Sequence, residues 1–231
     1  MNETYSPIIV VENLSFRYRE GDFHLHIPEL QIDAGMKIAI IGPSGSGKTT
    51  LINLLAGIVL PVSGRISVRG SHLEQLNDMA RRRFRIANVG FVFQDFALID
   101  YLSVLDNILY PYRINRALTL TPQVREHAVQ LATTMGIDDK LKRHIHHLSQ
   151  GEKQRAAICR ALVTRPPLLL ADEPTGNLDP TNKAHILDLL FQYVDEQKAS
   201  LIAVTHDHGL LSGFDRVVDF HQFHSRKGDH A

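Results

Sequence analysis

The sequence predicts an α/β protein with a parallel sheet as its core and a helical segment inserted into that sheet. Short apolar runs at residues 37–41, 168–171 and 201–204 are typical of buried strands, and the first run is followed by a glycine. Helical patterns separate these runs, and strands that alternate with helices favour a parallel sheet. From about residue 95 to 165 the pattern is helical throughout, which indicates an inserted helical subdomain.

Four further predicted strands consist of β-branched or aromatic residues with polar interruptions. They lie at residues 8–11, 14–18, 65–68 and 89–93. A helix is predicted from about residue 48 to 56, because Gly57 stands near its C-cap position and Pro61 lies beyond it.

Apolar residues at helical spacing mark the inserted segment. One stripe consists of Val104, Leu105, Ile108 and Leu109, and a second consists of Val124, Ala128 and Leu131. A last helix is predicted from about residue 182 to 197, between the final two core strands. Open parallel sheets bind ligands beyond the carboxyl ends of their strands, so functional residues are expected directly after the apolar runs.

The composition excludes several classes of protein. With 231 residues and an apolar fraction of 44%, the chain can form a full hydrophobic core. Its 25 basic and 25 acidic residues balance, which argues against nucleic acid as a partner because such binders carry a basic excess. A single cysteine, Cys159, excludes a disulfide within one chain and suits a reducing compartment.

The sequence predicts no membrane span. A span needs about 20 predominantly apolar residues, whereas the best candidate, residues 51–62, is shorter and contains Asn53, Gly57 and Pro61. The first residues also lack the basic and then apolar layout of a signal peptide. We therefore expect a soluble protein that reaches a membrane only through partners.

A phosphate-binding loop is predicted between a core strand and the first helix, where the chain runs Gly-Pro-Ser-Gly-Ser-Gly-Lys-Thr. Its glycines let backbone N–H groups point at phosphates, and the helix N-terminus adds positive potential. Lys48 supplies a charge to the phosphates and the Thr49 hydroxyl is a ligand for Mg²⁺. The alternative is a glycine-rich turn that precedes Lys-Thr by chance. The predicted ATP-binding residues here are Gly42, Pro43, Ser44, Gly45, Ser46, Gly47, Lys48, Thr49 and Thr50.

Two carboxylates follow the apolar run at residues 168–171. Asp172 comes first and is expected to reach the Mg²⁺ shell opposite the loop. Glu173 would then face the γ-phosphate from the side of the attacking water, where a carboxylate acts as a general base. Alone, such a pair could simply cap a following helix; its combination with the phosphate loop favours the catalytic interpretation.

The sequence also resembles the ABC transporter ATPases over nearly its whole length. Residues 148–155, Leu-Ser-Gln-Gly-Glu-Lys-Gln-Arg, are similar to the signature motif that separates this family from other phosphate-loop proteins. Gln94 matches the Q-loop glutamine, residues 176–179 match the D-loop, and His206 matches the switch histidine. Tyr18 lies where the family places an aromatic ring that stacks on adenine, although an aromatic residue in an edge strand often only packs.

The resemblance implies a fold and a domain organisation. It implies a RecA-like parallel sheet core, an antiparallel β subdomain and an inserted α-helical subdomain in one ABC ATPase domain. Residues 1–94 and 166–231 would form the nucleotide-binding core with its N-terminal β subdomain. Residues 95–165 would form the helical subdomain that carries the signature.

The resemblance also implies roles for single residues. Glu173, His206 and Gln94 would be catalytic, and Thr49, Gln94 and Asp172 would hold Mg²⁺. In this family two subunits enclose two ATP molecules, so a homodimer forms on ATP binding. The residues expected to contact the ATP of the other subunit are Ser149, Gly151, Glu152 and Asp179. The usual signature has glycine where this chain has Gln150, and a side chain there is expected to lower the hydrolysis rate.

The resemblance further implies membrane partners. Residues 171–179, Ala-Asp-Glu-Pro-Thr-Gly-Asn-Leu-Asp, are most similar to the ATPases that serve lipoprotein-releasing, macrolide-exporting and cell-division-type permeases. The chain ends soon after His206, so no regulatory domain of the sugar-importer type is expected. The subunit would be cytoplasmic and peripheral, on the cytoplasmic face of the inner membrane beside its transmembrane permease. Alternatives are a soluble ABC protein of translation or repair and a regulator that does not hydrolyse ATP.

Three further segments are candidates for binding a metal, a lipid or nucleic acid, or a partner protein. The histidines at positions 144, 146 and 147 resemble a metal tract but lack a cysteine or carboxylate at ligand spacing, so a solvated loop is favoured. The basic run of residues 81–85 could touch lipid headgroups or nucleic acid, but a solvated helix face is favoured. Phe96, Leu98 and Tyr101, after Gln94, are predicted to include an apolar anchor for the permease.

Overall fold

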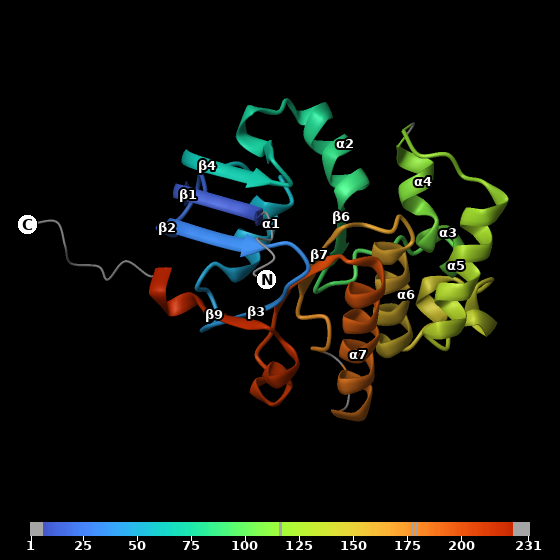
Figure 1. Cartoon of the computed structure of the whole chain (residues 1–231). Coiled ribbons are helices and arrows are strands. Elements are labelled where there is room, and N and C mark those ends of the chain that lie inside the picture. Colours follow the sequence, from blue (N-terminus) through green and yellow to red (C-terminus); the bar gives the residue numbers. More distant parts are fainter. Residues whose placement is uncertain (1–6, 116, 177, 179, 224–231) are drawn as a thin grey trace, which may run out of the picture.

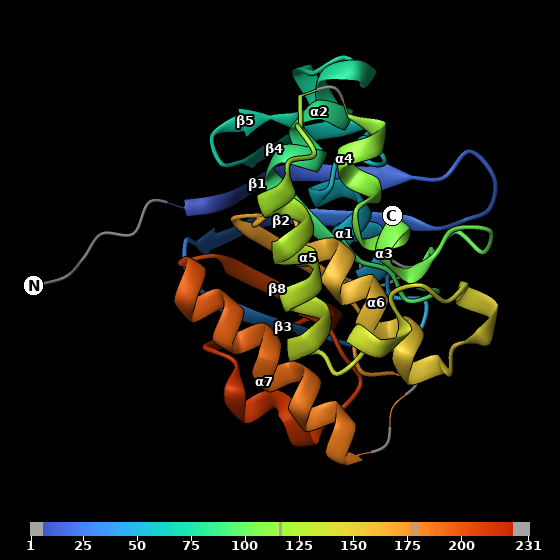
Figure 2. The ribbon, with the colours of Figure 1, turned by 90° about the vertical axis from the view of Figure 1, so that its right-hand side faces the viewer.

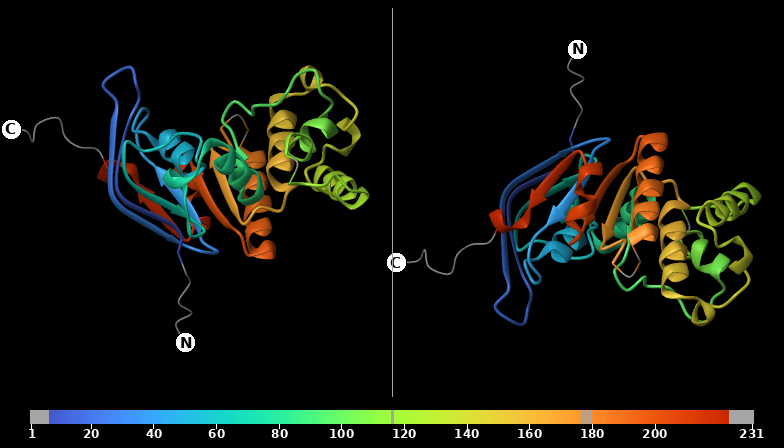
Figure 3. Two further views of the ribbon diagram at one scale, coloured as in Figure 1. Left: turned by 90° about the horizontal axis from the view of Figure 1, so that it is seen from above. Right: turned by 90° about the horizontal axis from the view of Figure 1, so that it is seen from below.

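The computed structural model describes residues 7–115, 117–176, 178 and 180–223. It contains two sheets and a group of helices that lie in successive layers (Figures 1 and 3). Viewed from above or below, the antiparallel sheet lies at one side, the parallel sheet in the centre and most helices at the other side. The predicted α/β class, with a parallel core, an antiparallel sheet and helices, is confirmed.

The parallel sheet is the core of the molecule. Its strands lie in the order β6 (Val89–Val92), β7 (Leu168–Asp172), β8 (Ser200–Val204), β3 (Lys37–Ile41) and β9 (Arg216–Asp219). Every neighbouring pair is parallel. Because the strands run the same way, the segments after β3, β6, β7 and β8 emerge at one edge of the sheet.

The second sheet is antiparallel, and the sequence predicted it only in part. Its order is β2 (His24–Asp33), β1 (Pro7–Arg17), β4 (Ser63–Val68) and β5 (Ser71–His72). The two short strands predicted at residues 8–11 and 14–18 are one long strand, and Tyr18 lies just past its end. Asn13 interrupts the pattern because it has a left-handed φ of 46°, where the register with β4 shifts. The sequence pattern did not reveal β2 or β9.

Helices cover both faces of the parallel sheet, which explains why its strands are continuously apolar. The helices are α1 (Lys48–Leu55), α2 (Asp78–Asn88), α3 (Val104–Ile108), α4 (Tyr110–Ile114), α5 (Pro122–Thr134), α6 (Gln150–Leu162) and α7 (Pro180–Gln197). Five short 3₁₀ helices lie at Leu73–Gln75, Asp138–Lys140, Ile145–His147, His208–Gly213 and Phe220–Phe223. Figure 2 shows α4, α5, α6 and α7 in front of the sheets.

Two hydrophobic clusters stabilise this arrangement. One lies between the two sheets and includes Leu51, Leu54 and Leu55 of α1. The other lies between the opposite face of the parallel sheet and the helices, and includes Ile158 and Leu162 of α6. Alternate residues of β7 and β8 enter each cluster, as the two-residue period of a strand requires. The sheet edge that carries the motifs is therefore held between two packed layers.

Candidate nucleotide site

The phosphate loop connects β3 to α1 at the carboxyl edge of the parallel sheet. Gly42, Gly45 and Gly47 have φ values of 148°, 75° and 100°, which side chains rarely adopt. A Cβ on Gly47 would also lie 2.7 Å from the Phe23 ring, so this position excludes other residues on two grounds. The glycine spacing of the sequence therefore corresponds to real backbone requirements.

Lys48, the first residue of α1, is folded back into the loop. Its Nζ donates to the carbonyl oxygens of Gly42 at 2.8 Å and Pro43 at 2.7 Å, and the residue is only 5% exposed. Burial lowers the pKa of Lys48, while the carboxylates of Glu173 and Asp172 oppose that shift. A desolvated ammonium group with weak acceptors is well suited to bind phosphate oxygens.

Asp172, the last residue of β7, lies opposite the start of α1. Asp172 and Thr49 line the same cavity, and the Thr49 side chain acts to lower the pKa of the Asp172 carboxyl group. Asp172 is 4% exposed, and its burial raises the pKa of its carboxyl group, with a further rise from the neighbouring Glu173. The free energy of keeping this charge buried is offset by Thr49, Lys48 and His206.

Glu173 lies between Gln94 and His206. Its Oε1 is 2.7 Å from Nε2 of His206, and its Oε2 accepts a hydrogen bond from Nε2 of Gln94 at 3.4 Å. Glu173 has a φ of 51°, an uncommon conformation for a residue with a side chain, and its N–H donates to Val204 of β8. The three side chains come from the ends of three neighbouring strands, β6, β7 and β8, so the parallel sheet brings them together.

A cavity of about 400 Å³ lies over the phosphate loop. Of the predicted residues, those that line it are Tyr18, Ser44, Gly45, Gly47, Lys48, Thr49, Thr50, Gln94, Glu173 and His206. Tyr18 is 43% exposed and exchanges a hydrogen bond with the Thr50 hydroxyl at 3.0 Å. Its ring stands edge-on to Phe16 and tilted against Phe23, at centroid distances of 4.8 and 5.7 Å. The ring of Tyr18 therefore packs against two aromatic neighbours and still exposes part of its surface.

The signature residues lie at the start of α6, apart from this cavity. Ser149 is the N-cap: its hydroxyl accepts from the N–H of Glu152, and the Glu152 carboxylate accepts from the N–H and the hydroxyl of Ser149. This capping box lowers the pKa of Glu152, mainly through the N–H of Ser149. Of the described residues that line the cavity, none is Ser149, Gly151 or Glu152. Asp179, the other residue predicted to contact a second subunit, lies outside the described residues.

Two aromatic residues of the site were not predicted. Phe23, which precedes β2, lines the cavity and packs against Gly47. Phe220 is fully buried and lies 3.0 Å from the position of a Cβ on Gly42. They are distant from the loop in sequence and belong to no motif, so only their aromatic character could have drawn attention to them.

The structure narrows one prediction about exposed segments and corrects another. Phe96 is buried and Leu98 is half-buried against the helical cluster, whereas Tyr101 is 80% exposed. In the basic run of α2, Arg82 and Arg83 are exposed, but Arg81 and Arg85 turn inward. They turn inward because the C-terminal carbonyls of α1 and of the preceding 3₁₀ helix need hydrogen-bond donors.

Comparison with known proteins decides the family. Residues 25–176 match the ABC transporter family. The chain belongs to this family. It is 37% identical to the lipoprotein-releasing system ATP-binding protein LolD of Hydrogenovibrio crunogenus, over 94% of this chain and 95% of that protein. It is 40% identical to LolD of Chromohalobacter salexigens, over 91% of this chain and 90% of that protein.

Solved structures agree. The ATP-binding cassette MJ0796, solved as a dimer in a post-hydrolysis state with ADP and Pi, superposes with a TM-score of 0.83 at 28% identity, over 91% of this chain and 93% of that one. This ABC protein is therefore an ATP-binding subunit that hydrolyses ATP, and the interpretation as a transporter subunit is favoured over the alternatives. Among the helices of the described residues, none is both long and apolar enough to cross a membrane.

Proposed function

We propose that this subunit hydrolyses ATP with Glu173 as the general base and drives a membrane permease. The observation that carries the catalytic assignment is the contact of Glu173 with His206 on one side and Gln94 on the other, at the rim of the phosphate-loop cavity. A carboxylate held between two polar side chains is positioned to accept a proton from a water molecule that attacks the γ-phosphate.

The residues around the loop also suit Mg²⁺. Thr49, Asp172 and Gln94 offer hydroxyl, carboxylate and amide oxygens, which are the hard ligands that Mg²⁺ prefers. All three residues line one cavity, so their oxygens face the same space. Bound there, the ion would neutralise negative charge that develops on the phosphate oxygens.

Each remaining polar group of the site has a proposed task. The backbone N–H groups of residues 44–49 and the ammonium group of Lys48 hold the phosphates, and Tyr18 offers its exposed ring to the adenine. His206 orients Glu173 and the attacking water through Nε2. Because Ser149, Gly151 and Glu152 lie apart from the cavity of their own chain, we assign them, with Asp179, to the ATP of a partner subunit. Two sites then form only in a head-to-tail homodimer.

Replacing Glu173 with Gln tests the catalytic assignment. The amide keeps the shape but cannot accept the proton, so we expect hydrolysis to fall by about 10²–10⁴-fold and ATP-bound dimers to accumulate. Size-exclusion chromatography with ATP and Mg²⁺ measures the dimer, and phosphate release measures the rate. The matched control is Glu29→Gln on the exposed side of β2. Wild-type hydrolysis by the variant, or a monomer at high concentration, contradicts the proposal.

We infer that the partner is a permease of the lipoprotein-releasing, macrolide-exporting or cell-division type. The similarity to two LolD proteins over almost their full length supports this choice. A subunit with such a partner would be cytoplasmic and peripheral on the inner membrane. We further infer that residues 95–165 act as a helical subdomain, since their buried residues pack into the helical cluster beside the parallel sheet.

Of the three apolar residues after Gln94, Tyr101 is the one that the fold leaves free to contact a permease. Tyr101→Glu is expected to weaken permease binding at least tenfold, since it places a charge in an apolar contact. A pull-down with the permease measures this, beside the hydrolysis rate of the isolated variant, which should be unchanged. Val217→Glu on the edge strand β9 adds the same charge elsewhere. Equal binding by both variants would place the contact outside Tyr101.

A further inference from the structure

A groove runs between α2, α4 and α6, away from the nucleotide cavity. It consists of two adjoining cavities, of about 970 and 250 Å³, that share Arg85, Ile86 and Ile114 as lining residues. The smaller cavity also reaches Arg160 of α6 and Ala97, which follows Gln94 by three residues. Two arginines from different parts of the fold thus lie at one groove, and neither was assigned a role from the sequence.

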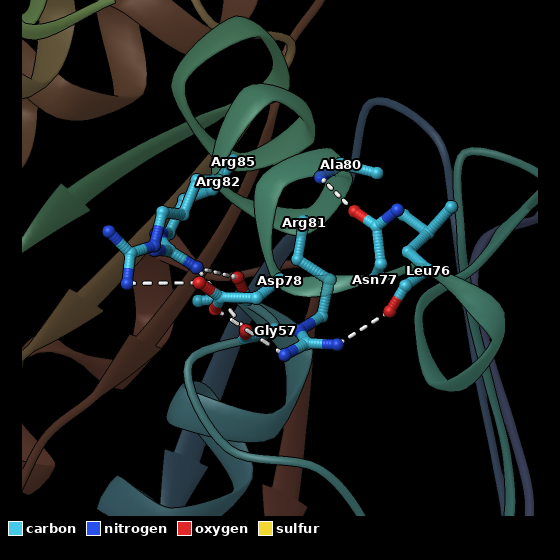
Figure 4. A network of polar contacts seen from close by, with 9 residues as sticks. Gly57, Leu76, Asn77, Asp78, Ala80, Arg81, Arg82 and Arg85 are labelled. Atoms are coloured by element: carbon cyan, nitrogen blue, oxygen red, sulfur yellow. Dashed lines mark hydrogen bonds and ion pairs between the residues drawn. The ribbon is translucent and has the colours of Figure 1, made fainter.

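Arg85 connects this groove to the helix that carries the phosphate loop. Its Nη1 donates to the carbonyl oxygens of Ala56 at 3.1 Å and Gly57 at 3.2 Å, which end α1 (Figure 4). These carbonyls lie at the negative end of the helix dipole and have no partner within the helix, so a guanidinium is the preferred donor. Burial lowers the pKa of Arg85, as do the neighbouring Arg82 and Arg81, while Asp78 opposes the shift.

Arg160 connects the same groove to the turn after Gln94. Its guanidinium donates to the carbonyl oxygens of both Phe96 and Ala97. These two residues have left-handed φ values of 63° and 48°, which are strained for residues with side chains. Burial lowers the pKa of Arg160 to about 10, against the opposing charge of Asp95. Breaking these bonds would leave a buried charge without partners, so the turn and α6 are expected to move together.

We propose that Arg85 and Arg160 are positioning residues that connect the groove to the two halves of the ATP site. Arg85 holds the C-terminal end of α1, whose N-terminal end presents Lys48 and Thr49 to the nucleotide. Arg160 holds the turn that aims Gln94 at Glu173. Because α1 is a rigid rod of eight residues, about 12 Å long, a displacement at one end reaches the other.

The two arginines therefore act on different steps. Loss of the Arg85 bonds loosens the phosphate loop, which binds ATP before any chemistry. Loss of the Arg160 bonds releases Gln94, whose contact is with the catalytic base. An occupant of the groove that shifts both guanidinium groups would change ATP affinity and turnover together. This last step rests on the proposed function, in which a permease helix docks beside the segment that follows Gln94.

The kinetics of the isolated subunit test the positioning roles. In Arg160→Lys one ammonium group replaces the planar guanidinium that donates to two carbonyl oxygens. We therefore expect kcat to fall about tenfold, while KM for ATP stays within about twofold of the wild-type value. In Arg85→Lys the KM should rise about tenfold instead. The control is Arg216→Met. It removes a guanidinium hydrogen bond of 3.0 Å to the carbonyl oxygen of Gln31, which lies outside the nucleotide site. Variants that match this control in both constants would overturn the proposal.

Two further variants separate positioning from simple stability. If Arg160 acts through Gln94, adding Arg160→Lys to Gln94→Ala lowers kcat no further than Gln94→Ala alone. Additive losses would overturn the Arg160 role. Arg160→Gln keeps a side-chain donor for the carbonyls of Phe96 and Ala97 without a buried charge, and it should lower kcat in the same direction even if Arg160→Lys folds poorly.

The complex with the permease tests the connection. The wild-type subunit should hydrolyse ATP at a different rate when it is bound to the permease, and both Lys variants should lose most of that difference while still co-purifying with it. Full retention of the difference overturns the connection. If the wild-type subunit hydrolyses ATP at the same rate with and without the permease, the proposed function is contradicted instead. The kinetics of the isolated variants then decide the positioning roles.

Discussion

At the edge of the parallel sheet, polar groups from four elements point at one another: Lys48 at the loop carbonyls, Thr49 at Asp172, and His206 and Gln94 at Glu173. At the start of α6 the opposite holds, because Ser149 and Glu152 satisfy each other three residues apart. The first region contains two buried charged side chains, Lys48 and Asp172, and a bound ligand can offset the free energy that their burial costs. The second is locally complete, so it can be offered to another chain without loss of structure.

The largest effect should separate the two regions by ATP binding. Lys48→Ala removes a charged donor from the phosphates of its own chain, so the Kd for ATP should rise about 10–100-fold. Ser149→Ala should bind ATP within about twofold of wild type and hydrolyse it poorly, because we assign the lost donor to the ATP of the partner. Equilibrium binding with a fluorescent ATP analogue measures both, and Lys142→Ala on the exposed loop before α6 is the control.

Mixing these two variants sharpens the comparison. In a heterodimer one composite site carries both changes and the other carries neither, so some hydrolysis should return. Equal loss of ATP binding in both single variants would show that the two regions serve the same chain. A mixture with no activity, in dimers proven to form, would mean that one intact site cannot turn over.

Tyr18 tests how far the first region extends beyond the phosphates. Tyr18→Ala should weaken ATP binding by about 1–3 kcal/mol if the ring stacks on adenine, whereas Tyr18→Phe keeps the ring and should bind normally. If the alanine variant instead loses thermal stability with unchanged ATP affinity, then the contacts with Phe16 and Phe23 are the role of this ring. Titration of ATP against inorganic triphosphate separates base from phosphate recognition.

Asp172 should make the nucleotide-free protein less stable as pH rises. Its folded pKa is raised, so its contribution to stability is fully present below the unfolded value of about 3.9 and is lost as pH passes through the folded pKa. Asp172→Asn should therefore add about 1 kcal/mol to the free energy of unfolding at pH 8, and less at pH 5. Urea denaturation without nucleotide measures this, and a destabilised variant at pH 8 would contradict it.

Glu152 should show the opposite sign and the smallest effect. Its folded pKa is lowered, so its contribution is present above its ordinary pKa and is lost as pH falls through the folded value. Glu152→Gln should cost about 0.5 kcal/mol at pH 7 and nothing at the acidic end of the denaturation series. The same urea experiment measures the effect of both carboxylates on the free energy of unfolding. If this free energy changed with pH in the same way in the two variants, the contrast between the two regions would be contradicted.

Much of this protein follows from the sequence because its decisive signals are local. The glycine spacing at residues 42–47 fixes a backbone path, and the apolar runs that become β3, β7 and β8 can be buried only as central strands. Ser149 and Glu152 form a cap by themselves. Such features depend on neighbours a few residues away, so a reader of the sequence can place them.

Other features were decided only when distant segments met. The strand β2 was missed because Pro28 and Glu29 interrupt the alternation of its apolar residues, and its identity comes from pairing with β1. Phe23 and Phe220 enter the site across long stretches of chain. Arg81 and Arg85 looked like part of a solvated face, yet they turn inward because the carbonyls that they meet belong to other elements. The sequence by itself determined the backbone path of the phosphate loop, since that path rests on closely spaced glycines. Tertiary structure decided which charges are buried and which carbonyls the arginines hold, since a hydrogen bond across the fold exists only once packing has brought both partners together.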